Sequence, residues 1–161
     1  MNLYIQQKIF TWGDKFSIYD EAGNEKYFVE GEVLTLGKKL HLYDLKGKEL
    51  AYIEQQLFTF RPRYLIYLGE EEFAEVVKEF TFFHPEYTVS GPGMNGEWTV
   101  HGDFFDHDYD VTDGENTIAS VSKEWFTFGD AYEISIGNNA DEVAALAVVL
   151  VIDACIDAQR N

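Results

Sequence analysis

Residues 143–152 read Val-Ala-Ala-Leu-Ala-Val-Val-Leu-Val-Ile, ten apolar residues in succession near the end of a chain of 161 residues. Asp141 and Glu142 precede this segment, and carboxylates in the first turn of a helix interact favourably with its dipole. Asn138 or Asn139 is the expected helix cap. A helix that is apolar on every side has to be enclosed by other elements. The segment therefore predicts a helix buried inside the rest of the fold.

Almost everything before this segment alternates apolar and polar residues in short runs, which is typical of half-buried strands. Glycines stand where turns need positive φ, as in Lys46-Gly47-Lys48, and Asn95-Gly96 is a hairpin pair. About a dozen strands are predicted. They cover residues 3–11, 15–21, 26–34, 39–45, 49–57, 62–69, 73–80, 86–90, 96–101, 104–111, 116–123 and 130–137.

A hairpin pattern recurs along the chain. Each copy has two apolar residues on a first strand, a phenylalanine in the connection, and a tyrosine and an aliphatic residue on a second strand. The copies are Ala51, Ile53, Phe60, Tyr64 and Ile66, then Ala74, Val76, Phe83, Tyr87 and Val89, then Ala119, Val121, Phe128, Tyr132 and Ile134. Because hairpins joined side by side can close on themselves, we predict a closed antiparallel barrel around the helix.

The expected dimensions agree with this mainly β architecture. Twelve strands about 4.8 Å apart and tilted by about 40° give a barrel radius near 12 Å. A helix about 5–6 Å in radius then leaves room for one layer of side chains. We therefore expect one domain over residues 1–161, a barrel of about twelve strands that encloses the C-terminal helix and leaves no roomy interior cavity.

Repeated hairpins, the run Trp98-x-x-x-Gly102-x-Phe104-x-x-x-x-Tyr109-x-Val111 and an apolar helix ending in Ile152-Asp153 resemble the LURP-one-related family. That family shares the tubby C-terminal-like superfold with tubby proteins and phospholipid scramblases. The resemblance extends over essentially the whole chain and implies a barrel closed around a hydrophobic helix. It consists of hydrophobic pattern and spacing, so it implies a fold and not an activity.

The chain carries a formal charge of −17, from 29 acidic and 12 basic residues, which disfavours binding to nucleic acid. Residues 1–69 are neutral overall, however, and six basic residues there could form a local patch. Its natural ligand is an anionic phospholipid headgroup or an acidic protein. The six residues are Lys38, Lys39, Lys46, Lys48, Arg61 and Arg63.

The stretch 103–110 carries a second candidate site. Asp106, Asp108 and Asp110 alternate, so they share one face of a strand, while Phe105 and His107 take the other. Clustered carboxylates attract Ca²⁺ or Mg²⁺ and suggest a metal-dependent hydrolase as an alternative function. Neighbours on one strand face lie about 6.6–7 Å apart, which is awkward for one ion and favours a solvated outer face.

Other candidate chemistry is weak. The glycines of 91–96 fit a dinucleotide-binding pattern, but a strand follows them, so they predict a hairpin loop. Cys155 is the only cysteine, and its place in the apolar segment predicts a buried thiol. Seven large aromatic residues are expected to pack between strands and helix. They are Trp12, Trp98, Trp125, Phe58, Phe60, Phe126 and Phe128.

These observations favour a noncatalytic binding or scaffold module that uses its outer barrel surface. We expect no cofactor, no nucleic acid, and as partner an unidentified protein or a lipid headgroup. The apolar run at 143–152 is shorter than the roughly 20 residues that span a bilayer. The lack of a secretion signal and of disulfide-forming cysteine pairs predicts a cytoplasmic protein.

Overall fold

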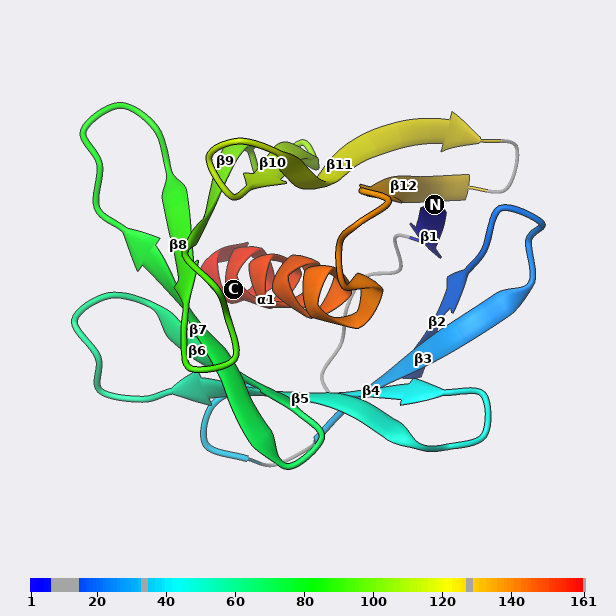
Figure 1. Ribbon diagram of the computed structural model, residues 1–161, viewed down its shortest axis with the longest axis horizontal. Helices are drawn as coiled ribbons and strands as arrows, with labels where there is room; N and C mark the ends of the chain where they lie inside the picture. The colour runs from blue at the N-terminus through cyan, green and yellow to red at the C-terminus, as the bar shows by residue number, and fades with distance from the viewer. Residues whose placement is uncertain (7–14, 33–34, 127–128, 161) are drawn as a thin grey trace.

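Twelve antiparallel strands close into a barrel around one helix, as Figure 1 shows for the computed structural model. The structure describes all residues except 7–14, 33–34, 127–128 and 161. The predicted architecture is therefore confirmed. The strands are β1 (Asn2–Gln6), β2 (Lys15–Tyr19), β3 (Glu25–Gly31), β4 (Lys39–Asp44), β5 (Glu49–Gln56), β6 (Arg63–Leu68), β7 (Glu71–Glu79), β8 (Glu86–Ser90), β9 (Trp98–Asp103), β10 (Asp108–Thr112), β11 (Thr117–Phe126) and β12 (Gly129–Ile136), and the helix is α1 (Glu142–Arg160).

The first and last strands close the ring. β1 pairs with β12 over its whole length, from Asn2 opposite Ser135 to Gln6 opposite Ala131. Every other strand pairs with its neighbours in sequence. Among the described residues every strand therefore has a partner on both sides, although β1 and β2 pair only at Tyr4 opposite Tyr19 and Ile5 opposite Ile18.

The connections alternate between the two ends of the barrel. We call one end the rim: its described loops are residues 57–62, 80–85 and 104–107 and the described part of 32–38, each following an odd-numbered strand. The opposite, far end holds the turns at 20–24, 45–48, 69–70, 91–97 and 113–116. The helix starts at the far end and ends near the rim, and the rim loops 57–62 and 80–85 lie on the left in Figure 1.

The sequence repeat supplies the inner wall of the barrel. In all three copies the strand residues are buried, with no more than 3% of any side chain exposed. Alanines on β5, β7 and β11 let the helix approach the wall closely, while tyrosines on β6, β8 and β12 fill the wider spaces. The twelve residues are Ala51, Ile53, Tyr64, Ile66, Ala74, Val76, Tyr87, Val89, Ala119, Val121, Tyr132 and Ile134.

The helix is enclosed on all sides. Residues 144–152 are at most 1% exposed, as their uninterrupted apolar character predicted. Among the described residues, no helix combines the length and the hydrophobicity that crossing a bilayer demands. The predicted cap at Asn138 or Asn139 is wrong, because Asp141 directly precedes the first turn and accepts a hydrogen bond from Ala144 N at 3.1 Å.

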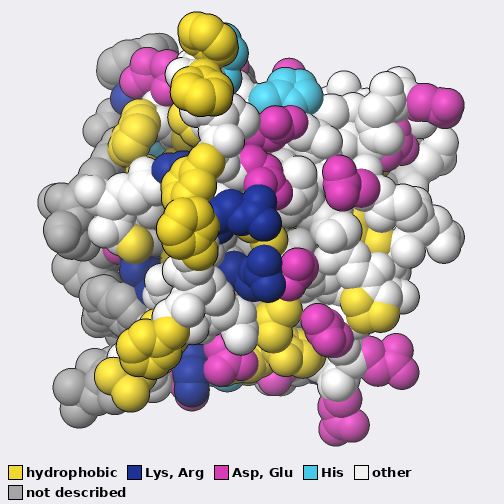
Figure 2. Space-filling view, turned by 90° about the vertical axis from the view of Figure 1, so that its left-hand side faces the viewer, with side chains coloured by type: hydrophobic (Ala, Val, Ile, Leu, Met, Phe, Trp, Pro, Cys, Tyr) yellow, Lys and Arg dark blue, Asp and Glu magenta, His cyan; other side chains and the backbone are white. Residues whose placement is uncertain are grey.

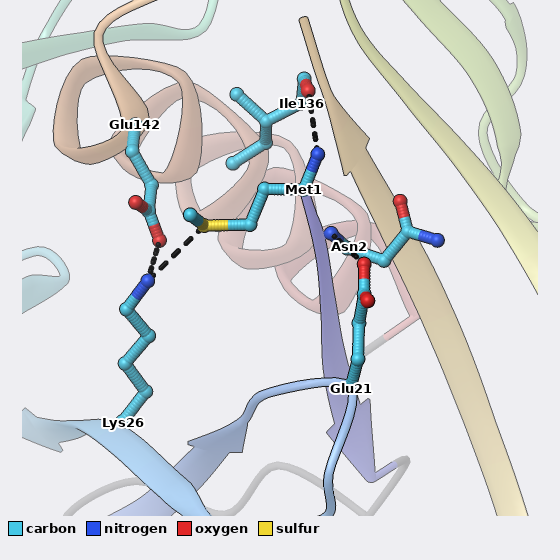
Figure 3. A network of polar contacts seen from close by, with 6 residues as sticks. All are labelled: Met1, Asn2, Glu21, Lys26, Ile136 and Glu142. Carbon is cyan, nitrogen blue, oxygen red and sulfur yellow. Dashed lines mark hydrogen bonds and ion pairs between the residues drawn. The ribbon is translucent and has the colours of Figure 1, made fainter. Parts of the chain in front are cut away.

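Polar contacts at the far end fix the start of the helix to the closing strands (Figure 3). Lys26 on β3 donates to Glu142 Oε1 at 2.8 Å and lies 3.1 Å from Met1 Sδ. The amino group of Met1 donates to the carbonyl of Ile136 at 3.3 Å. The helix start, β1, β3 and β12 are thereby held together around one small network.

Leu146 tests whether helix burial maintains the fold. Replacing it with alanine should lower the free energy of unfolding by about 2–5 kcal/mol, because a fully buried leucine leaves a cavity. Replacing it with aspartate should abolish cooperative unfolding, because the new charge has no route to water. Urea denaturation followed by circular dichroism measures both effects. Leu45→Ala, at an exposed position, should change stability by about 0.5 kcal/mol or less, and a stable Leu146→Asp protein would contradict the enclosure.

Candidate functional site

The structure does not gather the six predicted basic residues into one patch. The turn that holds Lys46 and Lys48 lies at the far end, whereas Arg61 lies in a rim loop. The eight-residue strand β5 separates the two places by about 26 Å. Lys38, Lys39 and Arg63 each have different surroundings. Ligand binding by any of these residues stays a prediction.

Lys38 is a structural residue inside the barrel. Its side chain is only 4% exposed, and its Nζ donates to the carbonyl of Ala154 at 2.8 Å and to Asp157 Oδ2 at 2.7 Å. A cation at the C-terminal end of a helix is favourable, because the unpaired carbonyls there carry partial negative charge. Lys38 thus fixes the end of α1 to the rim and is not available to an external anion.

Arg61 and Arg63 are half-exposed at the base of the rim loops, and each already faces a carboxylate. Arg61 forms an ion pair with Glu79, whose other oxygen accepts a hydrogen bond from Thr88 at 2.8 Å. Arg63 Nη1 lies 3.6 Å from Glu75 Oε2. These pairs offset much of the positive charge, so this surface attracts anions weakly.

Lys39 lies in acidic surroundings on the outer face of β4–β6. A hollow of about 560 Å³ there is lined by Glu32, Lys39, His41, Glu49, Tyr52, Glu54, Tyr67, Gly69 and Glu70. His41 contacts Glu49 and lies 3.6 Å from Glu32. Burial, with the neighbouring carboxylates of Glu54 and Glu32, raises the pKa of Tyr52 to about 12. The field in this hollow opposes an anionic ligand.

The acidic stretch is spread over a turn and a strand, and metal binding by it stays a prediction. Asp106 lies in the turn before β10 and not on a strand, while Asp108 and Asp110 are exposed on β10. Asp110 accepts a hydrogen bond from Ser120 at 2.5 Å. Among the described residues no three histidine, cysteine or carboxylate side chains are placed to hold a metal ion. The arrangement is that of a solvated outer face.

Exposed hydrophobic residues gather at the rim. Of the ten large hydrophobic side chains exposed in the described part of the chain, eight lie in the rim loops. Figure 2, which looks onto this side of the barrel, shows hydrophobic side chains in a row with basic ones beside them. The eight residues are Leu36, Leu57, Phe58, Phe60, Phe80, Phe82, Phe83 and Phe105.

The prediction that Phe58 and Phe60 pack between strands and helix is wrong. Both lie beyond the end of β5, where the strand alternation no longer directs side chains inward, and both are almost fully exposed. Trp98 does pack, half-buried, against the core beside Phe73. The other predicted aromatics fall outside the described side chains: these are Trp12, Trp125, Phe126 and Phe128.

Two of the rim loops are held next to each other. The rings of Phe60 and Phe80 meet edge to face with centroids 5.6 Å apart, which links loop 57–62 to loop 80–85. Phe58 adopts a φ of 60°, a conformation that costs a bulky residue of order 1–3 kcal/mol. Leu57 packs closely over Gly37 of the neighbouring loop. The exposed rings therefore stand on an organised support.

The two loops also differ from the rest of the chain in charge. Residues 57–62 read Leu-Phe-Thr-Phe-Arg-Pro and residues 80–85 read Phe-Thr-Phe-Phe-His-Pro, without any carboxylate. The chain as a whole has 29 acidic residues. The sequence therefore already contained a signal for an exposed binding surface. The prediction that Phe58 and Phe60 pack in the core overlooked it.

Below the rim, a polar layer joins the end of the helix to the wall. Asp153 on α1 accepts a hydrogen bond from the hydroxyl of Tyr132. His107 stacks on the Tyr132 ring at 4.5 Å, with its Nδ1 3.8 Å from Asp153 Oδ1. Burial raises the pKa of Tyr109 well above its ordinary value, and the nearby Asp153 adds to the effect. These contacts support the rim loops from inside.

The fold and the site define a helix-filled antiparallel barrel with a hydrophobic loop rim. Residues 1–153 match the family model described as LURP-one-related, and the chain belongs to that family, which confirms the resemblance. It is 39% identical over 153 residues to an uncharacterized protein of Bacillus subtilis, YxjI, covering 95% of this chain and 92% of that protein. A crystal structure of an Arabidopsis thaliana protein, AT5G01750, has the same fold, with a TM-score of 0.70 and 18% identity over 96% of this chain and 90% of that one.

The pair of Lys38 and Asp157 gives a second test of the fold beneath the rim. Lys38→Met should lower the free energy of unfolding by about 3 kcal/mol, because it leaves a partly buried carboxylate without its cation. Adding Asp157→Leu to that variant should recover most of the loss. Thermal and urea unfolding measure both. A single variant as stable as the parent would show that the pair does not fix the helix end.

Proposed function

We propose that this chain is a noncatalytic binding module that attaches to an apolar partner surface through its rim. The observation that carries the proposal is the placement of eight of the ten exposed large hydrophobic side chains in the loops of one barrel end. Large contiguous apolar patches on a protein surface mark sites of interaction with proteins, membranes or ligands. Attachment through loops also leaves the strands and the enclosed helix unchanged.

The burial energy available from the rim is of the size that association requires. Each exposed phenylalanine gains about 1.5–3 kcal/mol when a partner removes it from water. Four such rings, on Phe58, Phe60, Phe82 and Phe83, together supply about 6–12 kcal/mol when they are buried, which is comparable with the entropic cost of association. The strained backbone of Phe58 supports the same interpretation, because strain of this kind clusters at functional positions.

In this proposal Arg61 and Arg63 form the charged part of the surface. Both lie at the base of the rim loops and retain N–H donors beyond those facing Glu79 and Glu75, so they can donate to a phosphate or carboxylate. Lys38, Lys39, Lys46 and Lys48 take no part. A cytoplasmic location belongs to the proposal too, and the single buried thiol of Cys155 is compatible with a reducing compartment.

Detergent micelles provide a neutral apolar probe for the rim. The protein should associate with dodecyl maltoside micelles, and the triple variant Phe58→Ser, Phe82→Ser, Phe83→Ser should bind at least about 100-fold more weakly, because it loses three exposed rings. Sedimentation velocity measures the association. Leu45→Ser, which removes an exposed hydrophobic residue at the far end, serves as the matched control. No association by the parent protein, or equal association by the triple variant, would refute the proposal.

A further inference from the structure

We infer that the partner surface is a phospholipid bilayer, and that loops 57–62 and 80–85 insert into its headgroup region with the barrel standing end-on. The inference rests on the proposed function, since it names the partner of the same rim. It adds residues that the basic-patch prediction did not include, and it assigns the binding energy to aromatic insertion in place of charge attraction.

The projecting side chains of the rim favour a partner whose surface can deform around them. Phe58 and Phe82 are 103% and 101% exposed, so their rings project from the loop tips and touch almost nothing of the protein. A folded protein partner would need a separate pocket for each projecting ring. A bilayer accepts projecting rings without a preformed pocket, and phenylalanine and leucine side chains of surface-bound segments insert at the boundary between headgroups and acyl chains.

The composition of the two loops fits that boundary. Each loop places phenylalanines beside threonine, proline and one basic or imidazole side chain, Arg61 or His84. Thr59 Oγ1 donates to the carbonyl of Arg61 at 2.7 Å, so part of the loop's polar backbone is satisfied internally. Internal pairing lowers the cost of leaving water. Loops 57–62 and 80–85 themselves carry no carboxylate that anionic headgroups would repel, and the rim carboxylate Asp106 lies in the separate loop 104–107.

The negative charge of the chain does not prevent this orientation. The far end carries acidic turn residues, and in an end-on orientation strands of five to ten residues, tilted by about 40°, hold these roughly 13–25 Å from the rim. The Debye length is about 8 Å at physiological ionic strength, so their repulsion is screened. The acidic turn residues are Asp20, Glu21, Glu70, Glu97, Asp113 and Glu115.

Charge attraction between the rim and anionic lipid is weak, because the arginines at the rim are already paired with carboxylates. Glu79 and Glu75 offset Arg61 and Arg63, which leaves the phenylalanines as the main source of affinity. Binding should therefore depend little on salt and only modestly on lipid charge. This expectation separates insertion from purely electrostatic recognition of an anionic headgroup.

Insertion also requires the two loops to enter together. The edge-to-face contact of Phe60 with Phe80 holds them side by side, and Figure 2 shows the hydrophobic side chains of this end in one row. Phe105, on the loop between β9 and β10, is half-exposed at the same end of the barrel. The row is broad enough to set an orientation and does not act as a single anchor.

Vesicle co-sedimentation tests the inference directly. The protein should pellet with vesicles of phosphatidylcholine and slightly more with vesicles that also contain phosphatidylglycerol, with little change at high salt. Phe58→Ser and Phe82→Ser should each reduce the partition coefficient by about tenfold, and Leu45→Ser should leave it unchanged. Phe82→Trp should show a vesicle-dependent blue shift and quenching by brominated lipid, measured as the difference from the parent, whereas Leu45→Trp should show neither.

The outcomes separate this inference from the proposed function. Binding to micelles without binding to either vesicle would overturn the bilayer as partner and leave a rim that docks on a protein. Binding only to anionic vesicles, lost at high salt and insensitive to the phenylalanine variants, would overturn insertion. If the protein bound neither micelles nor vesicles, the proposed function itself would be overturned.

Discussion

The enclosure of one apolar helix is the constraint on which the rest of this structure depends. Residues 144–152 have no polar side to present to water, so the sheet has to close around them, and closure requires β1 to pair with β12. The helix in turn fills the space that an unoccupied barrel of this size would leave. Inward alanines and tyrosines adjust the wall to the helix, and Lys38, Asp153 and Tyr132 complete the fit near the rim. Sheet and helix therefore stabilise each other and fold as one unit.

A filled barrel moves function to the outside of the molecule. The outer faces of the strands are rich in carboxylates and paired cations, as at Glu75 and Arg63, and they offer little to an anionic ligand. The loops at the rim carry eight of the ten large hydrophobic side chains exposed among the described residues, while the polar layer beneath them holds the last turns of α1 in place. The arrangement separates a rigid interior from an adaptable surface, which is the usual way in which loops on a stable scaffold carry binding function.

Much of the fold was predictable from the sequence because burial imposes periodic patterns. The repeat that includes Ala51 and Tyr64 marks the inner wall correctly in all three copies. The core packing expected of Phe60 was wrong, because the strand alternation that directs side chains inward ends before this residue. Lys38 and Lys39 illustrate a second limit: Lys38, just before β4, is buried while Lys39, its first residue, is on the outer face, so a run of basic residues need not form a surface patch. The separation of Lys46 and Arg61 could have been predicted from the sequence, because a whole strand, β5, lies between them.

The reactivity of Cys155 tests the central claim most directly, because this single thiol lies on α1 and is 2% exposed. If the barrel encloses the helix, a thiol reagent should modify Cys155 only when the whole protein unfolds. Its labelling rate should then rise with urea in parallel with the loss of strand structure. Labelling in native buffer at the rate of an unprotected thiol, while the circular dichroism of the strands is unchanged, would show that the helix leaves the barrel without unfolding it and would contradict the account.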